Sequence, residues 1–190
     1  WAGATIYTYV GSGADGLNYK AGSTQTGYYL GGKMLDETST LITSYQPGSH
    51  FWVFMRYAET LLDYAEAQNE ASGPDQTVYA AIDSIRHRAG MPSLPTGLSR
   101  DAMRERIRHE RRIEMALEDT RFWDIRRWRI GTQVMKVANG MRITKNPDGT
   151  YHYAPFLVED RIYKPAFDLF PIPQTEMEKN KALVQNEGYN

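Results

Sequence analysis

Two glutamates, Glu110 and Glu114, have the spacing that places carboxylates on the inward face of a helix. Together with Met103, Ile107 and Leu117 they follow one another at steps of four, three, four and three residues, the spacing of one helix face. A carboxylate that is removed from water must form an ion pair or bind a proton. The pattern therefore indicates either an acid/base or metal site in a helical bundle, or an ion-pair network between helices.

Arginines and one further carboxylate follow these glutamates closely in the sequence. We expect the network to contain Glu110, Glu114, Arg111, Arg112, Arg121, Asp124, Arg126 and Arg127. Structural ion-pair networks perturb carboxylates as readily as active sites do, so we favour the structural interpretation. Neighbouring guanidinium groups also lower the pKa of a carboxyl group, which is unfavourable for a general acid. We predict no catalytic residue and keep a carboxylate-dependent hydrolase as an alternative.

Other motifs that carry chemistry do not fit their required context. A di-iron bundle needs Glu-x-x-His and a zinc protease needs His-Glu-x-x-His, but the residue three after Glu105 is Arg108 and the four histidines are scattered. The run from Gly11 to Gly16 matches G-x-G-x-x-G, yet the residues that follow have no helical period to form a pyrophosphate-binding helix. We expect no metal and no cofactor.

The N-terminal segment is the best candidate for recognition of a ligand. It is rich in tyrosine, glycine and asparagine, and a short strand over residues 4–10 would place Tyr7 and Tyr9 on one face. Tyrosine offers a flat apolar ring with a hydroxyl at its edge, which suits sugar rings or peptides. The candidate ligand-binding residues are Trp1, Tyr7, Tyr9, Asn18 and Tyr19. The alternative is that these aromatic rings merely cover the helical part of the chain.

Composition limits the class of protein. The net charge of −1 gives no electrostatic reason to expect nucleic acid or an anionic membrane as a partner. The absence of cysteine removes disulfides and thiolate zinc sites, and no apolar run is long enough to span a bilayer as a helix. A first residue of Trp1 without a preceding signal segment leads us to expect a processed or partial chain.

The chain divides into three parts by pattern. Residues 1–50 are loop-rich, residues 51–130 have helical periods, and residues 131–190 are irregular with a short hairpin and a C-terminal tail. We expect a single domain, or the C-terminal portion of a larger one. The fold class that follows is mainly α, with tetratricopeptide-like helical hairpins, loop-rich segments and minor β structure.

Caps and breakers set the expected element boundaries. The first helix contains Phe54 and ends near residues 72–74, and the second places Val78, Ile82, Ile85 and Ala89 on one face before Gly90. Ser99 is the expected N-cap of a third helix that runs toward Leu117, and a fourth covers residues 122–130. Residues 141–144 and 151–153 are expected to pair around a turn at 146–149, and a last helix begins near Gln174.

Several separated motifs resemble, in order, the SusD/RagB family of outer-membrane nutrient-binding lipoproteins. They are Thr26-Gly27-Tyr28-Tyr29-Leu30 with Lys33, the run from Arg56 to Ala67, the run from Ile85 to Gly90, Glu110-Arg111-Arg112-Ile113-Glu114, the run from Arg121 to Trp128, the run from Leu169 to Glu176, and the tail from Gln185 to Tyr189. The likeness spans most of the chain from Thr26 onward. It matches the C-terminal part of a full-length member.

The resemblance implies a location, a partner and a fold. Such proteins lie on the surface of Gram-negative bacteria of the Bacteroides type, are lipid-anchored through an N-terminal cysteine and cover a SusC-like TonB-dependent transporter. They bind glycans or other large nutrients through variable loop residues, perform no chemistry, and contain tetratricopeptide-like hairpins. This chain lacks the signal peptide, the lipid-bearing cysteine and the N-terminal half of that pattern, so the resemblance implies the anchor without showing it.

Two hypotheses about function follow. The first is a non-catalytic component for the uptake of an oligosaccharide or other nutrient, which the chain would pass to the transporter. The second is a helical interaction module that docks a partner protein without a ligand site of its own. Nucleic acid is not expected as a partner in either case.

Overall fold

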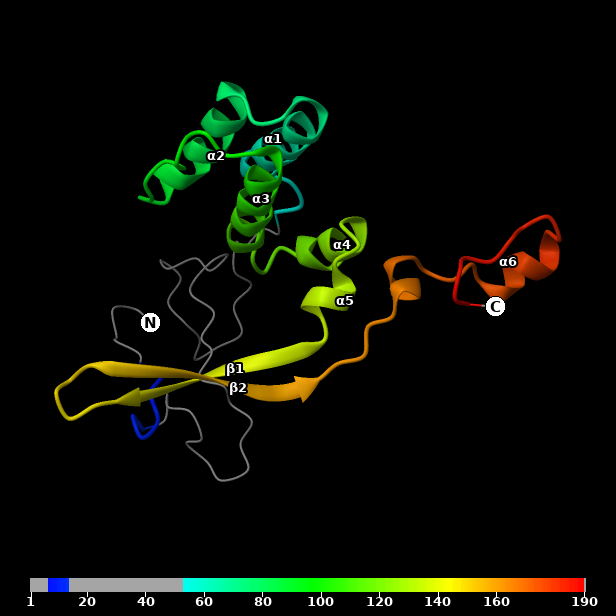
Figure 1. Cartoon of the computed structure of the whole chain (residues 1–190). Coiled ribbons are helices and arrows are strands. Elements are labelled where there is room, and N and C mark those ends of the chain that lie inside the picture. The colour runs from blue at the N-terminus through cyan, green and yellow to red at the C-terminus, as the bar shows by residue number, and fades with distance from the viewer. Residues whose placement is uncertain (1–6, 14–52, 190) are drawn as a thin grey trace, which may run out of the picture. The chain divides into compact units, whose positions relative to one another are not determined.

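A computed structural model of the chain describes residues 7–13 and 53–189 (Figure 1). Val53–Trp128 form one compact unit, and residues 7–13 and 129–189 belong to a second. Three of the candidate ligand residues, Trp1, Asn18 and Tyr19, lie outside the described residues. The expectation of a single domain, or of the C-terminal portion of a larger one, stays a prediction.

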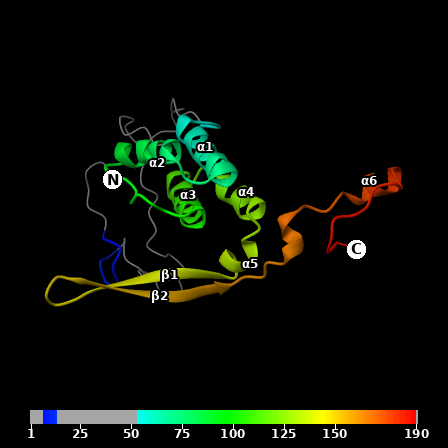
Figure 2. The same cartoon turned by 45° about the horizontal axis from the view of Figure 1, so that its top comes forward.

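Three helices form the body of the first unit. α1 (Tyr57–Ser72) packs against both α2 (Gln76–Arg88) and α3 (Arg100–Glu114), and the three stay together when the view is turned (Figure 2). α1 begins after Phe54, contrary to the sequence prediction, because Arg56 is extended and Phe54 is 87% exposed. A short connection over residues 73–75 joins α1 to α2, and these two helices form a helical hairpin of the kind that the sequence predicted.

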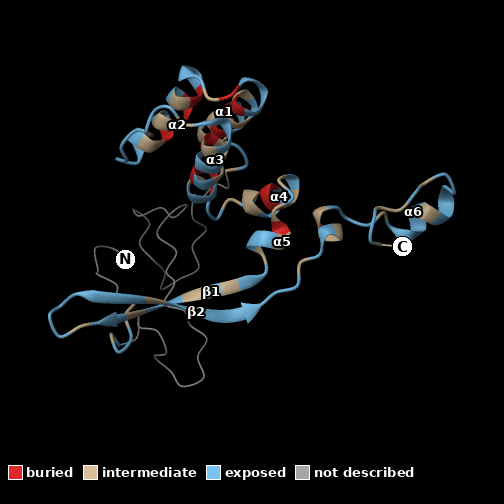
Figure 3. Cartoon of the chain, viewed as in Figure 1, coloured by how far each residue is buried: buried red, intermediate tan, exposed pale blue. Residues whose placement is uncertain are grey.

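The core of this unit lies where the three helices face one another (Figure 3). Leu62, Ile82, Met103 and Ile107 are each at most 1% exposed. The buried face of α1 continues to Asn69, whose side-chain amide donates to the backbone oxygen of Arg100 over 3.1 Å. Apolar surface at helical spacing therefore positions α3, and with it the glutamates that follow Ile107.

The helix starts depend on side-chain caps. The carboxylate of Asp75 accepts hydrogen bonds from the backbone N–H groups of Thr77 and Val78 at the start of α2. Ser99 caps α3 by accepting from the N–H of Ala102 over 3.2 Å, as predicted. After α2 the chain turns at Gly90, which has a φ of 71° that glycine adopts without strain.

The Asp75 cap predicts a specific dependence of stability on pH. Hydrogen bonds from Thr77, Val78 and Gln68 lower the pKa of Asp75 from 3.8 to about 2. A carboxyl group whose folded pKa is depressed stabilises the fold above its unfolded pKa, and that contribution is lost as the pH falls toward the folded value. The melting temperature of Asp75→Asn should therefore lie below that of the parent at about pH 5 and approach it near pH 2. Thermal unfolding followed by circular dichroism measures the difference, and a difference that does not change with pH would contradict it.

α3 ends earlier than predicted. Its last residue is Glu114, and Leu117 and Asp119 then adopt φ values of 70° and 60°. Such left-handed conformations cannot continue a right-handed helix. Leu117 is consequently 44% exposed, so the prediction that it shares the buried face is wrong. α4 (Thr120–Arg127) follows and buries Asp124 and Ile125; it begins and ends before the expected residues 122–130.

The second unit contains short helices and a β-hairpin. α5 (Gly131–Val134) precedes β1 (Val137–Lys145), which pairs antiparallel with β2 (Tyr151–Asp160) around a turn closed by hydrogen bonds between residues 146 and 150. Both strands are longer than the segments predicted from sequence. η1 (Pro165–Asp168) and α6 (Gln174–Lys179) follow, and α6 begins where Gln174 was predicted to start a helix.

Hydrogen bonds fasten the C-terminal tail to the segment before α6. Gln185 accepts from the N–H of Ile172 over 2.8 Å and donates to its carbonyl over 2.9 Å. The Tyr189 hydroxyl donates to the Leu169 carbonyl over 3.0 Å. Taken together, the described residues are mainly helical with a minor β component, and this confirms the predicted fold class. No helix in residues 53–189 has the length and hydropathy needed to cross a bilayer.

Candidate functional site

Glu110 and Glu114 both form ion pairs, but not with the arginines that the sequence suggested. Nη1 of Arg86 donates to Oε2 of Glu110 over 2.8 Å. Glu114 accepts from Nη1 of Arg56 over 2.5 Å and from Nη2 of Arg88 over 2.7 Å. The expectation that partners come from the next turns of the chain is wrong because these guanidinium groups belong to α2 and to the residue before α1. The pairs therefore join α3 to its neighbours.

The guanidinium group of Arg56 donates hydrogen bonds to residues at and just after the C-terminal end of α3. Its Nε and Nη2 atoms donate to the carboxylate of Glu118 over 2.7 and 2.8 Å, and Nη2 also donates to the backbone oxygen of Glu114 over 2.7 Å. Hydrogen bonds to Glu118, followed by those to Glu114, raise the pKa of Arg56 above its ordinary value in spite of burial. Arg56 thus supplies the last turn of α3 with the cation that its exposed carbonyl groups favour.

Of the charged residues that the structure describes, Arg111 and Asp124 have the lowest exposed fractions, 6% and 3%. Nε of Arg111 donates to Oδ2 of Asp124 over 2.7 Å, and its Nη1 donates to Asp63 over 2.6 Å. Burial alone would lower the pKa of Arg111, but Asp124 and Asp63 raise it above the ordinary value. Arg111 therefore connects α3 to α4 through Asp124 and to α1 through Asp63.

Arg127 extends this network to α1. Its guanidinium binds the carboxylate of Glu66 through both Nη atoms, and Nη2 also lies 3.1 Å from Oδ1 of Asp124. Nε1 of Trp128 donates to the same Glu66 over 2.9 Å. Burial raises the pKa of Glu66, but Arg127 and Trp128 together hold it below its ordinary value. Glu66 is therefore ionised at neutral pH.

The other arginines named from sequence have different roles. Arg126 donates to the Phe122 carbonyl over 3.0 Å, and its guanidinium carbon lies 3.5 Å from the centre of the Phe122 ring. Neither Arg112 nor Arg121 forms a salt bridge in the part of the chain that the structure describes. Besides Arg56, Arg86, Arg88 and Glu118, sequence reasoning missed a row of carboxylates on α1 that recur at steps of four, three and four: Glu59, Asp63, Glu66 and Glu70.

The network can do little acid/base chemistry. Hydrogen bonds from Arg127 and Arg104 lower the pKa values of Glu66 and Glu70 in spite of burial, whereas a general acid needs a raised pKa. Among the described residues, no three His, Asp or Glu side chains are grouped so as to hold a metal ion. The geometry supports a structural role for these charges.

Glu110→Gln separates that role from a catalytic one. The amide keeps the shape of the side chain but removes the negative charge facing Arg86, so the charge-assisted hydrogen bond becomes at best a bond to a neutral oxygen, while the bond from Arg86 to the Pro92 carbonyl stays. We expect the free energy of unfolding to fall by about 1–3 kcal/mol, measured by urea titration. The hydrolase alternative requires the reverse pattern, with unchanged stability and a loss of turnover on a polysaccharide substrate.

Aromatic rings gather in the second unit, beside the end of the β-hairpin. The ring centre of Tyr9 lies 6.0 Å from that of Tyr7 and 5.8 Å from that of Tyr151, and Nζ of Lys145 lies 5.6 Å from it. The N–H of Val10 donates to the Ile143 carbonyl over 2.9 Å, which holds this segment on β1. Residues 7–10 do not form a strand, so the predicted strand is wrong over its described half, because a turn closed by Ser12 follows at once.

The strand register adds residues that the sequence alone did not identify as ligand candidates. Lys145 pairs with Tyr151 and Ile143 pairs with Tyr153, so these side chains share one face of the hairpin. Tyr7, Tyr151 and Tyr153 are 49%, 40% and 58% exposed. We call Tyr7, Tyr9, Tyr151 and Tyr153 the tyrosine cluster. It offers exposed rings of the kind that contact sugars.

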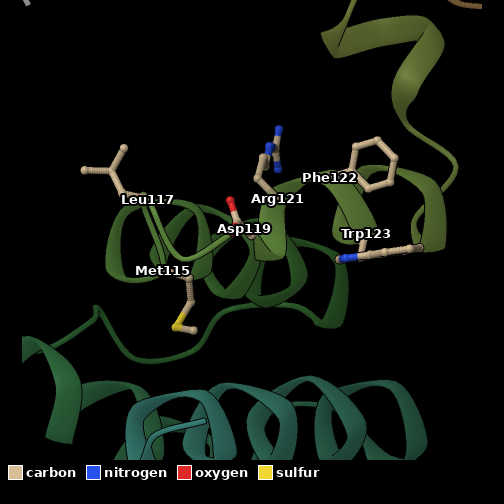
Figure 4. Close-up of a pocket in the computed structure, with 6 residues that line it drawn as sticks. All are labelled: Met115, Leu117, Asp119, Arg121, Phe122 and Trp123. Carbon is tan, nitrogen blue, oxygen red and sulfur yellow. The ribbon is translucent and has the colours of Figure 1, made fainter. Parts of the chain in front are cut away.

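A separate pocket of about 450 Å³ opens at the start of α4 in the first unit (Figure 4). Its lining residues are Met115, Leu117, Asp119, Arg121, Phe122 and Trp123. Figure 4 shows Asp119, Arg121 and Phe122 projecting to the same side of the ribbon, with Met115 on the opposite side. The rings of Phe122 and Trp123 meet edge to face with centres 5.0 Å apart.

Comparison with known proteins shows which protein family the chain belongs to. The sequence profile of the SusD family matches residues 2–189, and the chain belongs to that family. The chain is similar to SusD-like protein P2 of Formosa agariphila, with 33% identity over 146 residues that cover 73% of this chain and 26% of the relative. It is also 27% identical to SusD-like protein P38 of the same organism, over 67% of this chain and 24% of the relative.

Solved structures agree with the fold. A SusD-like protein from Bacteroides fragilis superposes with a TM-score of 0.68 at 34% identity, over 83% of this chain and 30% of that one. A SusD homolog from Bacteroides thetaiotaomicron has a TM-score of 0.54 at 29% identity, over 80% of this chain and 30% of that one. The chain spans about a quarter of the length of the curated relatives it matches.

Proposed function

We propose that this chain is part of a non-catalytic component that binds an oligosaccharide or other nutrient at the outer membrane and passes it to a SusC-like TonB-dependent transporter. The observation that carries the proposal is membership of the SusD family over residues 2–189. As a family, SusD-like proteins are nutrient- and glycan-binding components associated with the outer membrane. A lipid anchor at the cell surface belongs to the same proposal.

The ligand site that we propose is the tyrosine cluster. Tyr9 contacts both Tyr7 and Tyr151, which comes from a distant part of the sequence, and the ammonium group of Lys145 lies over the Tyr9 ring. Aromatic faces supply apolar contact to a sugar ring, and the phenol and ammonium groups at their edge can hydrogen-bond its hydroxyls. Trp1, Asn18 and Tyr19 remain predicted members of this site.

The ion-pair network supports the non-catalytic part of the proposal. Arg56, Arg86 and Arg111 neutralise the carboxylates that a hydrolase would have used. A binding protein needs a rigid scaffold that carries its recognition loops, and buried, hydrogen-bonded charges supply such rigidity.

A panel of neutral and acidic polysaccharides tests the proposal. Affinity electrophoresis should show retardation by at least one polysaccharide, with no release of shorter products during incubation. Pull-down with a SusC-like transporter should recover the complex. Retardation by no polysaccharide, together with transporter binding that changes on the helical unit abolish, would instead support the helical interaction module.

A further inference from the structure

Arg121 is a partly buried cation that is not paired directly with a carboxylate in the part of the chain that the structure describes. Among the described residues it makes no hydrogen bond or salt bridge, whereas the neighbouring Arg111 and Arg127 each bind two carboxylates or more. Burial lowers the pKa of Arg121, the positive charge of Arg112 lowers it further, and the negative charge of Asp124 opposes these effects only in part. A positive charge held away from water beside a second one favours the arrival of an anion.

The surroundings of Arg121 indicate what kind of anion fits. It lines the pocket of about 450 Å³ with Phe122 and Trp123, which are 44% and 59% exposed. That volume lies in the range of small-ligand pockets, and exposed aromatic faces offer apolar contact to a sugar ring. Asp119, on the same side of α4, can accept a hydrogen bond from a sugar hydroxyl (Figure 4).

We propose that this pocket binds an anionic sugar residue, with the carboxylate or sulfate group on Arg121 and the ring against Phe122 and Trp123. A guanidinium group donates two parallel hydrogen bonds to either group, which gives both affinity and orientation. The proposal rests on the proposed function, because it specifies acidic glycans as a class of ligand. It assigns them to the helical unit, separately from the tyrosine cluster.

Calorimetric titration with matched trimers tests it. The probes are a trimer of galacturonic acid, a sulfated trimer of galactose and the neutral trimer of galactose. We expect at least one acidic trimer to bind about tenfold or more tightly than the neutral one. Arg121→Gln should abolish that preference, because hydrogen bonds to a charged group contribute enough for a tenfold change. Carboxylate and sulfate are distinguished by which trimer binds.

Arg106→Gln is the matched control. Arg106 lies on the exposed side of α3 and, among the described residues, makes no salt bridge either, so its loss removes the same net charge away from the pocket. Its affinities should stay within about twofold of the parent. Equal effects of the two substitutions would show that net charge alone is responsible and would overturn the proposal. Equal binding of the charged and neutral trimers would also overturn it.

Two further measurements keep the outcome decisive. If Arg121→Gln does not fold, Arg121→Lys keeps the charge but loses the planar fork, and it should still weaken acidic binding several-fold; unchanged binding would contradict the proposal. Competition by triglutamate as strong as that by the acidic trimer would assign the pocket to a protein segment instead. If acidic preference is absent while some polysaccharide in the panel still binds, this inference fails and the proposed function stands.

Discussion

Arg111→Met should lower the free energy of unfolding by about 3–5 kcal/mol. Methionine replaces the aliphatic part of the arginine side chain but not its guanidinium group, so it leaves Asp124, which is 3% exposed, without its main cation. A buried carboxylate without a partner must bind a proton or draw in water, and both cost free energy. Chemical unfolding by urea, followed by circular dichroism, measures the change.

Arg104→Met is the control on the same helix. Arg104 binds Glu70, but their side chains are 27% and 41% exposed, and we expect a loss of about 0–1 kcal/mol. The double variant Arg111→Met with Asp124→Leu should recover much of the lost stability, because it removes the unpaired carboxylate as well. A loss as small as that of the control, or a double variant no more stable than Arg111→Met, would show that the Arg111–Asp124 pair is not what secures α4.

The helical part of the fold was predictable from local chemistry. Ser99 and Gly90 mark a start and an end because a capping hydroxyl and a positive φ are properties of single residues. The apolar spacing of Val78, Ile82 and Ile85 identified the buried face of α2. These signals lie within one or two helical turns, so they can be read without knowledge of the tertiary structure.

The ion-pair partners were not predictable in the same way. Arg56 reaches Glu114 and Glu118 across about sixty residues of sequence, and Arg86 reaches Glu110 across 24. Helical spacing shows that Glu110 faces inward, but it cannot show which neighbouring helix supplies the cation. For Arg104, Arg111 and Arg127 a signal was available in the sequence, because their partners Glu59, Asp63, Glu66 and Glu70 form a stripe of carboxylates along α1.

That stripe also fixes the direction in which α1 and α3 pack. Glu59, near the start of α1, faces Arg111 near the end of α3, whereas Glu70, near the end of α1, faces Arg104 near the start of α3. Complementary charges in opposite order are those of an antiparallel pair. A sequence reading that compared the two stripes could have predicted this arrangement.

The tyrosine cluster shows a different limit of sequence reasoning. Tyr7 and Tyr9 were identified by composition, but their neighbour Tyr151 comes from a strand whose register depends on the turn at residues 146–150. The predicted strand over residues 4–10 placed Tyr7 and Tyr9 on one face, and their rings do contact each other, although residues 7–10 do not form a strand. In the described half, the contact between the two rings comes with a turn and not with an extended strand.

Replacing Tyr9 and Tyr151 together with alanine should weaken binding of the preferred polysaccharide by about tenfold or more. Tyr9 lies at the centre of the cluster, in contact with Tyr7 and Tyr151 and close to Lys145, so its loss removes a ring and the support of two others. Few contacts usually dominate a binding site, and aromatic residues are frequent among them. Affinity electrophoresis across a range of polysaccharide concentrations gives the change in affinity.

Tyr57→Ala provides the matched control, because Tyr57 is 75% exposed at the start of α1 in the other unit. It should leave the affinity unchanged, and transporter pull-down should be retained in every variant. If the double variant binds polysaccharide as the parent does, the cluster is a packing feature and the recognised surface lies elsewhere. If polysaccharide and transporter binding are lost together, the rings support a surface that the transporter recognises. Loss of polysaccharide alone requires that the tyrosine cluster itself contacts the sugar, since the helical unit and its ion pairs are untouched by these substitutions.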